Sequence, residues 1–184
     1  MRDFLLDTQT VRYWYDSKCP QNQAVVANIT SLRKQAESLE HKPRLLVSVI
    51  TLGEIEFGHR VNSSPNVDIQ ADYLRFVNEQ LPDRWDVTEA AASVFGELRR
   101  RLFDKFAPGE KRKPKMRPEQ LIDPITSREL GIQENDLWLC AQAVGHDMVL
   151  VTNDGMRRIR AVSAGMQPLL LLQDWTIPNT AGVE

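Results

Sequence analysis

Four short runs of apolar or β-branched residues stand out along the chain, and each is too short to form a helix of ordinary length. They occupy residues 3–6, 45–50, 148–152 and 169–172, with a briefer run at 85–87. Uninterrupted apolar runs of this length are typical of strands that are buried on both faces. The runs therefore predict a sheet in the interior of the protein.

Between these runs, apolar residues recur at every third or fourth position, which places them on one face of a helix. The clearest example covers residues 22–40, where the predicted buried face consists of Val25, Ile29, Leu32, Ala36 and Leu39. A helix is also expected to begin in Thr8-Gln9-Thr10, because a threonine side chain can cap free backbone N–H groups. Further helices are predicted at 51–61, at 69–81, from Thr88 to about 106, and from about Glu134 to 146.

Strands that alternate with helices predict an α/β sandwich with a mainly parallel sheet flanked by helices. A chain of 184 residues fits a single domain that covers residues 1–184. The periodicity is lost between about residues 107 and 130, where Pro, Lys and Arg are frequent. This stretch predicts a basic, Pro-rich insertion in the form of a long loop.

The chain carries few signs of a special environment. No apolar run approaches the roughly 18–20 residues of a membrane span, and the start "MRDFLLDT" does not read as a signal peptide. Cys19 and Cys140 lie in unrelated contexts, which favours a reduced, cytoplasmic protein. The three histidines are scattered, which argues against a zinc site.

The net charge of −2 conceals an uneven distribution. Residues 99–117 contain nine basic and two acidic residues, a net charge of +7, so the rest of the chain carries −9. Such a distribution indicates a basic surface for an anionic partner, with acids gathered elsewhere. A solvated charged loop explains the same segment equally well.

Four acids fall at comparable points of separate strand–helix units. Asp7 and Asp154 follow predicted strands, Glu54 lies one turn into the helix after the second strand, and Asp136 lies in the first turn of a later helix. Each of them alone is explained by helix capping, a turn or a surface position. Together, at the edge where parallel sheets bind ligands, they predict a site at which a cation offsets carboxylate repulsion. Oxygen ligands of this kind suit Mg²⁺ or Mn²⁺.

Four sequence motifs resemble those of PIN-domain ribonucleases, of the VapC-like toxin kind found in type II toxin–antitoxin pairs. The motifs are "FLLDT", "SVITLGEIEFG", "ENDLWLCAQA" and "LVTNDGMRRI", in this order and spanning nearly the whole chain. The resemblance implies a PIN-like three-layer sandwich. It also implies that Asp7, Glu54, Asp136 and Asp154 form the catalytic metal-binding quartet, with Thr152 and Asn153 as supporting polar residues. Two departures, the long basic insertion and Trp138 after the third acid, bear on substrate choice and partner binding.

The reaction that the resemblance implies is hydrolysis of RNA phosphodiester bonds by an endoribonuclease that depends on Mg²⁺ or Mn²⁺. Backbone phosphates are expected to bind basic side chains, which give affinity without sequence choice. The candidates are Arg99, Arg100, Arg101, Lys111, Arg112, Lys113, Lys115, Arg157, Arg158 and Arg160. The expected partners are RNA, a small antitoxin protein and a second copy of the chain in a homodimer, with no membrane.

Two other classes of function remain open at this point. The first is a non-catalytic PIN-like module that binds nucleic acid or a partner protein and uses its acids for structure only. The second, a phosphatase-like hydrolase on another α/β fold, lacks support because the sequence has no glycine-rich phosphate loop and no evident nucleophile motif. A test of the purified protein on RNA with Mg²⁺, Mn²⁺ or EDTA distinguishes a nuclease from a binding module.

Overall fold

The computed structural model describes residues 1–62, 66–107 and 116–177, which form two compact units. Unit 1 comprises residues 1–86, 149–154 and the chain from 172 onward, and unit 2 comprises residues 87–148 and 155–171. Both units are discontinuous in sequence, because the chain leaves unit 1 after Asp86 and returns to it for residues 149–154.

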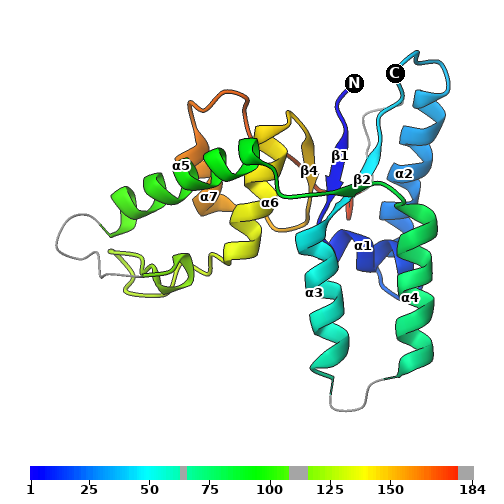
Figure 1. Cartoon of the computed structure of the whole chain (residues 1–184), viewed down its shortest axis with the longest axis horizontal. Helices are drawn as coiled ribbons and strands as arrows, with labels where there is room; N and C mark the ends of the chain where they lie inside the picture. The colour runs from blue at the N-terminus through cyan, green and yellow to red at the C-terminus, as the bar shows by residue number, and fades with distance from the viewer. Residues whose placement is uncertain (63–65, 108–115, 178–184) are drawn as a thin grey trace. The chain divides into compact units, whose positions relative to one another are not determined.

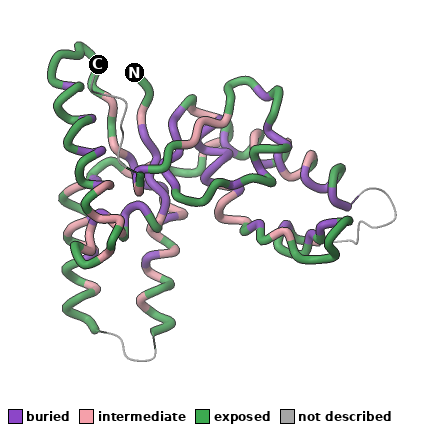
Figure 2. Tube along the Cα trace, turned by 180° about the vertical axis from the view of Figure 1, so that it is seen from behind, coloured by how far each residue is buried: buried purple, intermediate pink, exposed green. Residues whose placement is uncertain are grey.

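A five-stranded sheet forms the centre of unit 1. Its strands lie in the order β3 (Arg84–Trp85), β2 (Leu45–Ser48), β1 (Phe4–Leu6), β4 (Val149–Val151) and β5 (Leu171–Gln173). The pairs β1–β2, β1–β4 and β2–β3 are parallel, with Leu6 opposite both Val47 and Val151. All residues of β1 and β4 are buried (Figure 2). The prediction of an α/β fold with a mainly parallel sheet is confirmed.

Four helices of unit 1 connect or flank these strands (Figure 1): α1 (Thr8–Tyr15), α2 (Asn22–Ala36), α3 (Val49–Arg60) and α4 (Val67–Gln80). Helix α1 contacts each of the other three. Its Val11 and Trp14 are buried, and Trp14 packs edge-on against Phe76 of α4 at 5.2 Å between ring centroids. The short helix α1 is therefore the element around which the helices of unit 1 pack.

Several element boundaries differ from the sequence prediction, among them the ends of α2 and β2 and the start of β5. Helix α2 ends at Ala36, which leaves the predicted core residue Leu39 exposed. Strand β2 ends at Ser48, because the Ser48 hydroxyl accepts a hydrogen bond from the backbone N–H of Ile50 and so caps α3. Strand β5 begins two residues later than predicted, and Leu169 is exposed.

Unit 2 is helical, with α5 (Glu89–Phe106), the 3₁₀ turn η2 (Pro118–Gln120), α6 (Glu134–Gly145) and α7 (Arg157–Ser163). Helix α5 contacts the other three elements and buries Phe95, Leu98 and Leu102. The predicted start of α5 at Thr88 is confirmed, since the Thr88 hydroxyl accepts from the backbone N–H of Ala91. No described helix is long and apolar enough to cross a membrane.

The described part of the predicted insertion is irregular but packed. Residues 108–115 lie outside the described residues, whereas Pro118, Leu121 and Asp123 are buried. The Asp123 carboxylate accepts hydrogen bonds from the backbone N–H groups of Ile125 and Thr126, at 2.9 and 3.2 Å. Residues 116–130 are thus largely irregular, as the prediction of a long loop expects, and a few spaced apolar residues and one carboxylate anchor them.

Candidate acidic site

Asp7 stands at the junction between the central strand β1 and helix α1. Its backbone N–H donates to the carbonyl of Val151 at 3.1 Å, which extends the β1–β4 pairing by one residue. Its side chain is the N-cap of α1, accepting from the backbone N–H of Thr10 at 2.6 Å. The sequence prediction gave this capping role to a threonine. The carboxylate fills it instead, since its Oδ1 reaches an otherwise unsatisfied donor of the first turn.

The next residue along the chain links Asp7 to Glu54. The Thr8 hydroxyl donates a hydrogen bond to Oε2 of Glu54, on the second turn of α3. Strands β1 and β2 lie side by side in parallel, so the helices that follow them start at the same edge of the sheet. The structure thus brings Asp7 and Glu54 together, as the pattern of the acids suggested.

The end of β4 supplies the polar wall next to Asp7. Thr152 is buried, its backbone N–H donates to the carbonyl of Gln173 at 2.9 Å, and its hydroxyl interacts with the Asp7 carboxylate. The same hydroxyl accepts from the backbone N–H of Asp154 at 3.0 Å. The side chains of Asn153 and Asp154 are exposed. Thr152 therefore ties the turn that carries Asp154 to the end of β1.

The environment of Asp7 disfavours its charged form. Burial raises the pKa of this carboxyl, hydrogen bonds with Thr10 and Thr152 lower it, and the charge of Glu54 raises it again, leaving the pKa above its usual range. Only 7% of the residue is exposed. A cation at this position would reverse the balance by stabilising the carboxylate.

The donor set fits a hard divalent ion. Two carboxylates, Asp7 and Glu54, and two hydroxyls, Thr8 and Thr152, offer only oxygen atoms. Mg²⁺ is commonly bound by one or two carboxylates, with water and substrate phosphates completing its shell. Within the described parts of the chain, no three His, Cys, Asp or Glu side chains gather closely enough to form a metal-binding group of their own. Asp7 and Glu54 are the residues that would hold such an ion.

The third predicted acid belongs to the other unit. Asp136 lies in the first turn of α6, in unit 2, and is partly exposed. Near it, Trp138 stacks face to face on Phe95 of α5, with 3.8 Å between ring centroids and an interplanar angle of 9°. An acid in the first turn of a helix is also favoured by the helix dipole.

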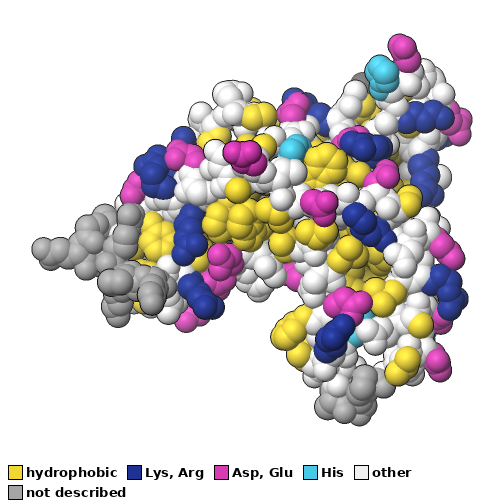
Figure 3. All heavy atoms as spheres, viewed as in Figure 1, with side chains coloured by type: hydrophobic (Ala, Val, Ile, Leu, Met, Phe, Trp, Pro, Cys, Tyr) yellow, Lys and Arg dark blue, Asp and Glu magenta, His cyan; other side chains and the backbone are white. Residues whose placement is uncertain are grey.

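The arginines of α5 are engaged within unit 2. Arg100 pairs with Glu97 and Asp104, at 2.9 and 2.6 Å, and Arg101 pairs with Glu97 at 2.6 Å. Arg99 lies 3.6 Å from a carboxylate oxygen of Glu134. On the face shown in Figure 3, basic side chains lie next to acidic ones. The charges of these arginines are therefore partly neutralised. This fits the interpretation of residues 99–101 as a solvated helix face.

The other predicted phosphate-binding residues fall into three groups. Arg158 pairs with the buried Asp123 at 2.6 Å. Arg157 and Arg160 are exposed, and no ion pair of theirs is found among the described residues. The remaining candidates lie outside the described residues: Lys111, Arg112, Lys113 and Lys115.

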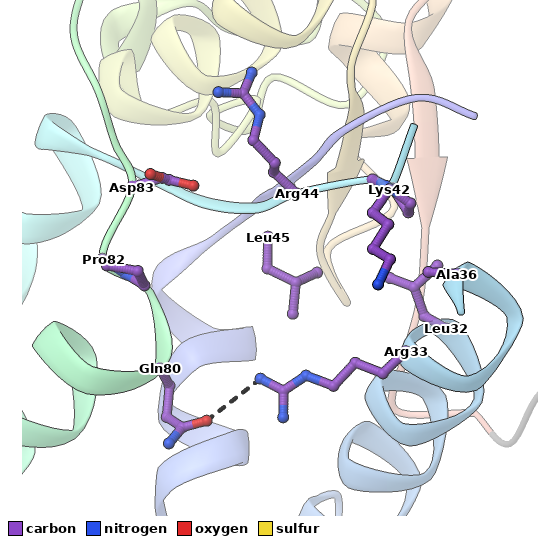
Figure 4. A pocket seen from close by; sticks show the side chains of 10 residues that line it. Leu32, Arg33, Ala36, Lys42, Arg44, Leu45, Gln80, Pro82 and Asp83 are labelled. Carbon is purple, nitrogen blue, oxygen red and sulfur yellow. Dashed lines mark hydrogen bonds between the residues drawn. The ribbon is translucent and has the colours of Figure 1, made fainter. Parts of the chain in front are cut away.

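A cavity of about 360 Å³ lies at the other end of the sheet, where β2 begins (Figure 4). Leu32, Leu45 and Pro82 contribute apolar walls. Arg33 reaches across to donate to Gln80 at 3.3 Å. Leu45 is paired with Phe4 at the start of β1, whereas Asp7 follows the end of that strand. This cavity is therefore separate from the acidic site.

Sequence reasoning missed two residues of the acidic site. Thr8 holds Glu54, and Thr10 supplies the capped N–H to Asp7 while its hydroxyl donates to the carbonyl of Val151 at 3.1 Å. The available signal was an aspartate directly before the predicted start of a helix, since Asp is a preferred N-cap residue.

No protein-family model matches the sequence, and no curated protein matches it significantly. Solved structures do match. VapBC2 from Rickettsia felis, bound to a DNA fragment from its promoter, gives a TM-score of 0.62 at 20% identity, covering 94% of this chain and 98% of the other. DNA-bound VapBC from Salmonella typhimurium gives 0.60 at 19% identity, covering 95% and 99%. FitAcB from Neisseria gonorrhoeae gives 0.56 at 17% identity, covering 94% and 97%.

The chain has a PIN-like α/β fold. The resemblance to VapC-like proteins that the four motifs indicated is thereby confirmed at the level of the fold. The PIN-like fold extends over nearly the whole chain, including both units.

Proposed function

We propose that the protein is an endoribonuclease that hydrolyses RNA phosphodiester bonds with Mg²⁺ or Mn²⁺ and acts as the toxin of a toxin–antitoxin pair. The observation that carries the proposal is the pairing of the buried Asp7 with Glu54 at the carboxyl edge of a parallel sheet. Two carboxylates held together at one edge of the sheet suit a divalent cation. Asp136 and Asp154 are proposed to complete the quartet, with Thr152 and Asn153 in support.

A divalent ion bound here would supply a water of lowered pKa and offset negative charge on the attacked phosphate. The residues of the chain set the geometry. Asp7 is fixed by the backbone of β4 and the first turn of α1, and Thr8 fixes Glu54. Thr152 holds the Asp154 turn, so that this acid can orient a water molecule at the same edge. Fixed ligands of this kind lower the reorganisation that the reaction requires.

The proposed partner protein is a small antitoxin, as the likeness to VapBC and FitAcB structures suggests. A homodimer is also proposed, from the resemblance of the four sequence motifs to VapC-like proteins. Exposed arginines are proposed to bind RNA phosphates. Arg157 and Arg160 are the first candidates, because they are exposed and no ion pair of theirs is found among the described residues.

The test is cleavage of RNA by freshly purified protein with Mg²⁺, Mn²⁺ or EDTA, alongside Asp7→Asn and Glu54→Gln. Cleavage that needs the metal and both acids supports the proposal. Cleavage by Asp7→Asn at the wild-type rate contradicts the assignment of the site. Binding of RNA without any cleavage, under all metal conditions, favours the non-catalytic module, for which the capping role of Asp7 is the supporting observation.

A further inference from the structure

The cavity at the start of β2 lies entirely within unit 1. Its walls come from α2, from the chain that leads into β2, and from the chain between the end of α4 and β3. The last two segments are tied to the sheet. The backbone carbonyl of Arg44 accepts from the N–H of Phe4 at 2.9 Å, and that of Asp83 accepts from the N–H of Val47 at 3.4 Å. The volume of about 360 Å³ falls within the range of small-molecule sites, about 300–1,000 Å³.

Arg33 of α2 is held in this cavity without an acidic partner. Its guanidinium carbon lies 5.5 Å from the centroid of the buried Trp14 ring, and Nη2 donates to Oε1 of Gln80 at 3.3 Å. A guanidinium carries several N–H donors, so others remain beyond the one that Gln80 accepts. No ion pair of Arg33 is found among the described residues. An exposed guanidinium that is positioned by a ring and an amide, and whose charge is not compensated, suits an oxyanion.

Lys42 adds a second positive charge to the same cavity. Figure 4 shows its side chain extending past Leu45 toward α2, the helix that carries Arg33. Lys42 is exposed, and no hydrogen bond or ion pair of it is found in the part of the chain that the structure describes. Arg44 differs, because its guanidinium pairs with Asp3 at 2.7 Å. Two cations without acidic partners, from separate segments, therefore border one accessible cavity.

The rest of the lining gives the cavity a direction. Leu45 and Pro82 provide apolar surface, and the carboxylate of Asp83 lies across Leu45 from Lys42 (Figure 4). An anionic group is attracted to the side of Arg33 and Lys42 and repelled from the side of Asp83. A carboxylate accepts hydrogen bonds, so the Asp83 side favours N–H donors. The lining therefore suits a ligand with an anion at one end, an apolar middle and N–H groups at the other end.

A phosphate monoester matches two cations better than a carboxylate does, because it carries a charge of about −1.5 to −2 at neutral pH and three acceptor oxygens. A nucleobase supplies both a flat apolar surface and N–H donors. We propose that this cavity binds a nucleoside phosphate, with the phosphate on Arg33 and Lys42 and the base against Leu45 and Pro82. A free nucleotide and the phosphorylated end of an RNA strand present the same group. The site is independent of the proposed nuclease chemistry, because Asp7 lies at the opposite end of β1.

The test is calorimetric titration of the purified protein, in EDTA, with adenosine and guanosine 5′-monophosphate. The wild type should bind a nucleotide, and the corresponding nucleoside should bind at least about tenfold more weakly. Arg33→Gln and Lys42→Gln each remove one charge and should each weaken nucleotide binding about ten- to hundredfold. Lys34→Gln is the matched control, since Lys34 is exposed next to Arg33 but does not line the cavity. Its affinity should equal that of the wild type.

Lys42→Gln removes no contact found within the described chain, so it should melt at the wild-type temperature and serves as the test even if Arg33→Gln is unstable. The inference is overturned if the wild type binds neither nucleotide at millimolar concentration, or if Lys42→Gln binds as the wild type does. It is also overturned if Asp7→Asn abolishes binding, because the nucleotide then occupies the acidic site.

Labelled RNA oligonucleotides with a 5′-phosphate or a 5′-hydroxyl distinguish the two sources of the ligand, again in EDTA. Tighter binding of the phosphorylated RNA, lost in Lys42→Gln, assigns the cavity to the end of an RNA strand. Equal binding of both RNAs, together with nucleotide binding that needs Lys42, assigns it to a free nucleotide. Neither result depends on cleavage, so a protein without nuclease activity can still confirm the nucleotide site.

Discussion

The Thr8 hydroxyl donates a hydrogen bond to the carboxylate of Glu54, across 46 positions of the sequence. Thr8 directly follows Asp7, so one residue of α1 connects Asp7 with Glu54. The first turn of α1 is itself fastened to the end of β4, through Thr10 and the carbonyl of Val151. The acidic site is therefore assembled on three adjacent strands by the start of one short helix.

Removing this hydroxyl tests whether the link matters. Thr8→Val keeps the shape and branching of the side chain but leaves Glu54 without the donor. We expect the rate of RNA cleavage to fall about tenfold or more, as for other groups that orient reacting parts, with a small change in stability. Single-turnover kinetics measure the effect. Thr30→Val is the matched control, since Thr30 bonds only within the exposed face of α2; an equal loss in both variants would contradict the role.

The charge of Asp7 should destabilise the protein in the absence of divalent ions. Asp7→Asn keeps an oxygen for the N-cap and removes the buried charge, so its melting temperature should exceed that of the wild type. Asp7→Ala also loses the cap, which costs about 0.5–2 kcal/mol, so it should melt below Asp7→Asn. Thermal unfolding in EDTA compares the three proteins, and an Asp7→Asn variant that melts lower than the wild type would argue against a costly charge.

The same comparison has a defined dependence on pH. The pKa of Asp7 is raised in the folded state, so the folded protein binds more protons than the unfolded chain between the ordinary pKa of 3.8 and the raised pKa. The wild type should therefore gain stability relative to Asp7→Asn as the pH falls through that window. Melting curves at a series of pH values measure the difference. If the melting temperature of Asp7→Asn rises further above that of the wild type on acidification, the pKa of Asp7 is not raised in the folded state.

Divalent ions should stabilise the wild-type protein through the acidic pair. A ligand that binds only the folded state at a hundred times its Kd adds about 2.7 kcal/mol of stability. Addition of Mn²⁺ or Mg²⁺ should raise the melting temperature of the wild type and leave that of the double variant Asp7→Asn, Glu54→Gln nearly unchanged. Calorimetry or fluorescence-detected unfolding provides the measurement, and equal shifts in both proteins would place the metal elsewhere.

The arginines of α7 should separate into binding and structural residues. Arg157→Ala with Arg160→Ala removes two exposed charges, so RNA affinity should fall and its salt dependence should flatten by about one counterion per lost contact. Arg158→Ala should instead lower stability, because it leaves the buried Asp123 without its arginine. Binding at two salt concentrations and thermal unfolding give both readouts. If both variants change RNA affinity and melting temperature alike, the arginines of α7 do not divide into binding and structural residues.

Asp123 should make the packing of residues 116–130 sensitive to acid. Backbone N–H groups of Ile125 and Thr126, and then Arg158, hold the pKa of this carboxyl below its usual value of 3.8. Its contribution to stability is thus present above about pH 3.8 and is lost as the pH falls through the folded-state pKa. The melting temperature of Asp123→Asn should lie below that of the wild type at pH 6, and the gap should close toward pH 2.

The sequence by itself determined the strands, most of the helices and the parallel α/β fold, because buried apolar residues recur along the chain with the period of the helix or strand. It also placed Asp7 at a strand end. The sequence did not predict the boundaries at Ser48 and Ala36. A single side-chain hydrogen bond ends β2 at Ser48, and α2 ends at Ala36, before the exposed residues that follow it. The packing of residues 116–130 could not be predicted for a similar reason: a few spaced apolar residues and one carboxylate anchor this segment without helical or strand periodicity.

Only the tertiary structure decided which side chains meet. The hydrogen bond between Thr8 and Glu54 exists because β1 and β2 are neighbours in register, a fact that no local pattern contains. The engagement of Arg158 by Asp123 likewise depends on a contact between elements distant in sequence. Residue type and spacing encode burial, whereas the partner of a polar group is fixed only when the packing of the elements brings donor and acceptor together.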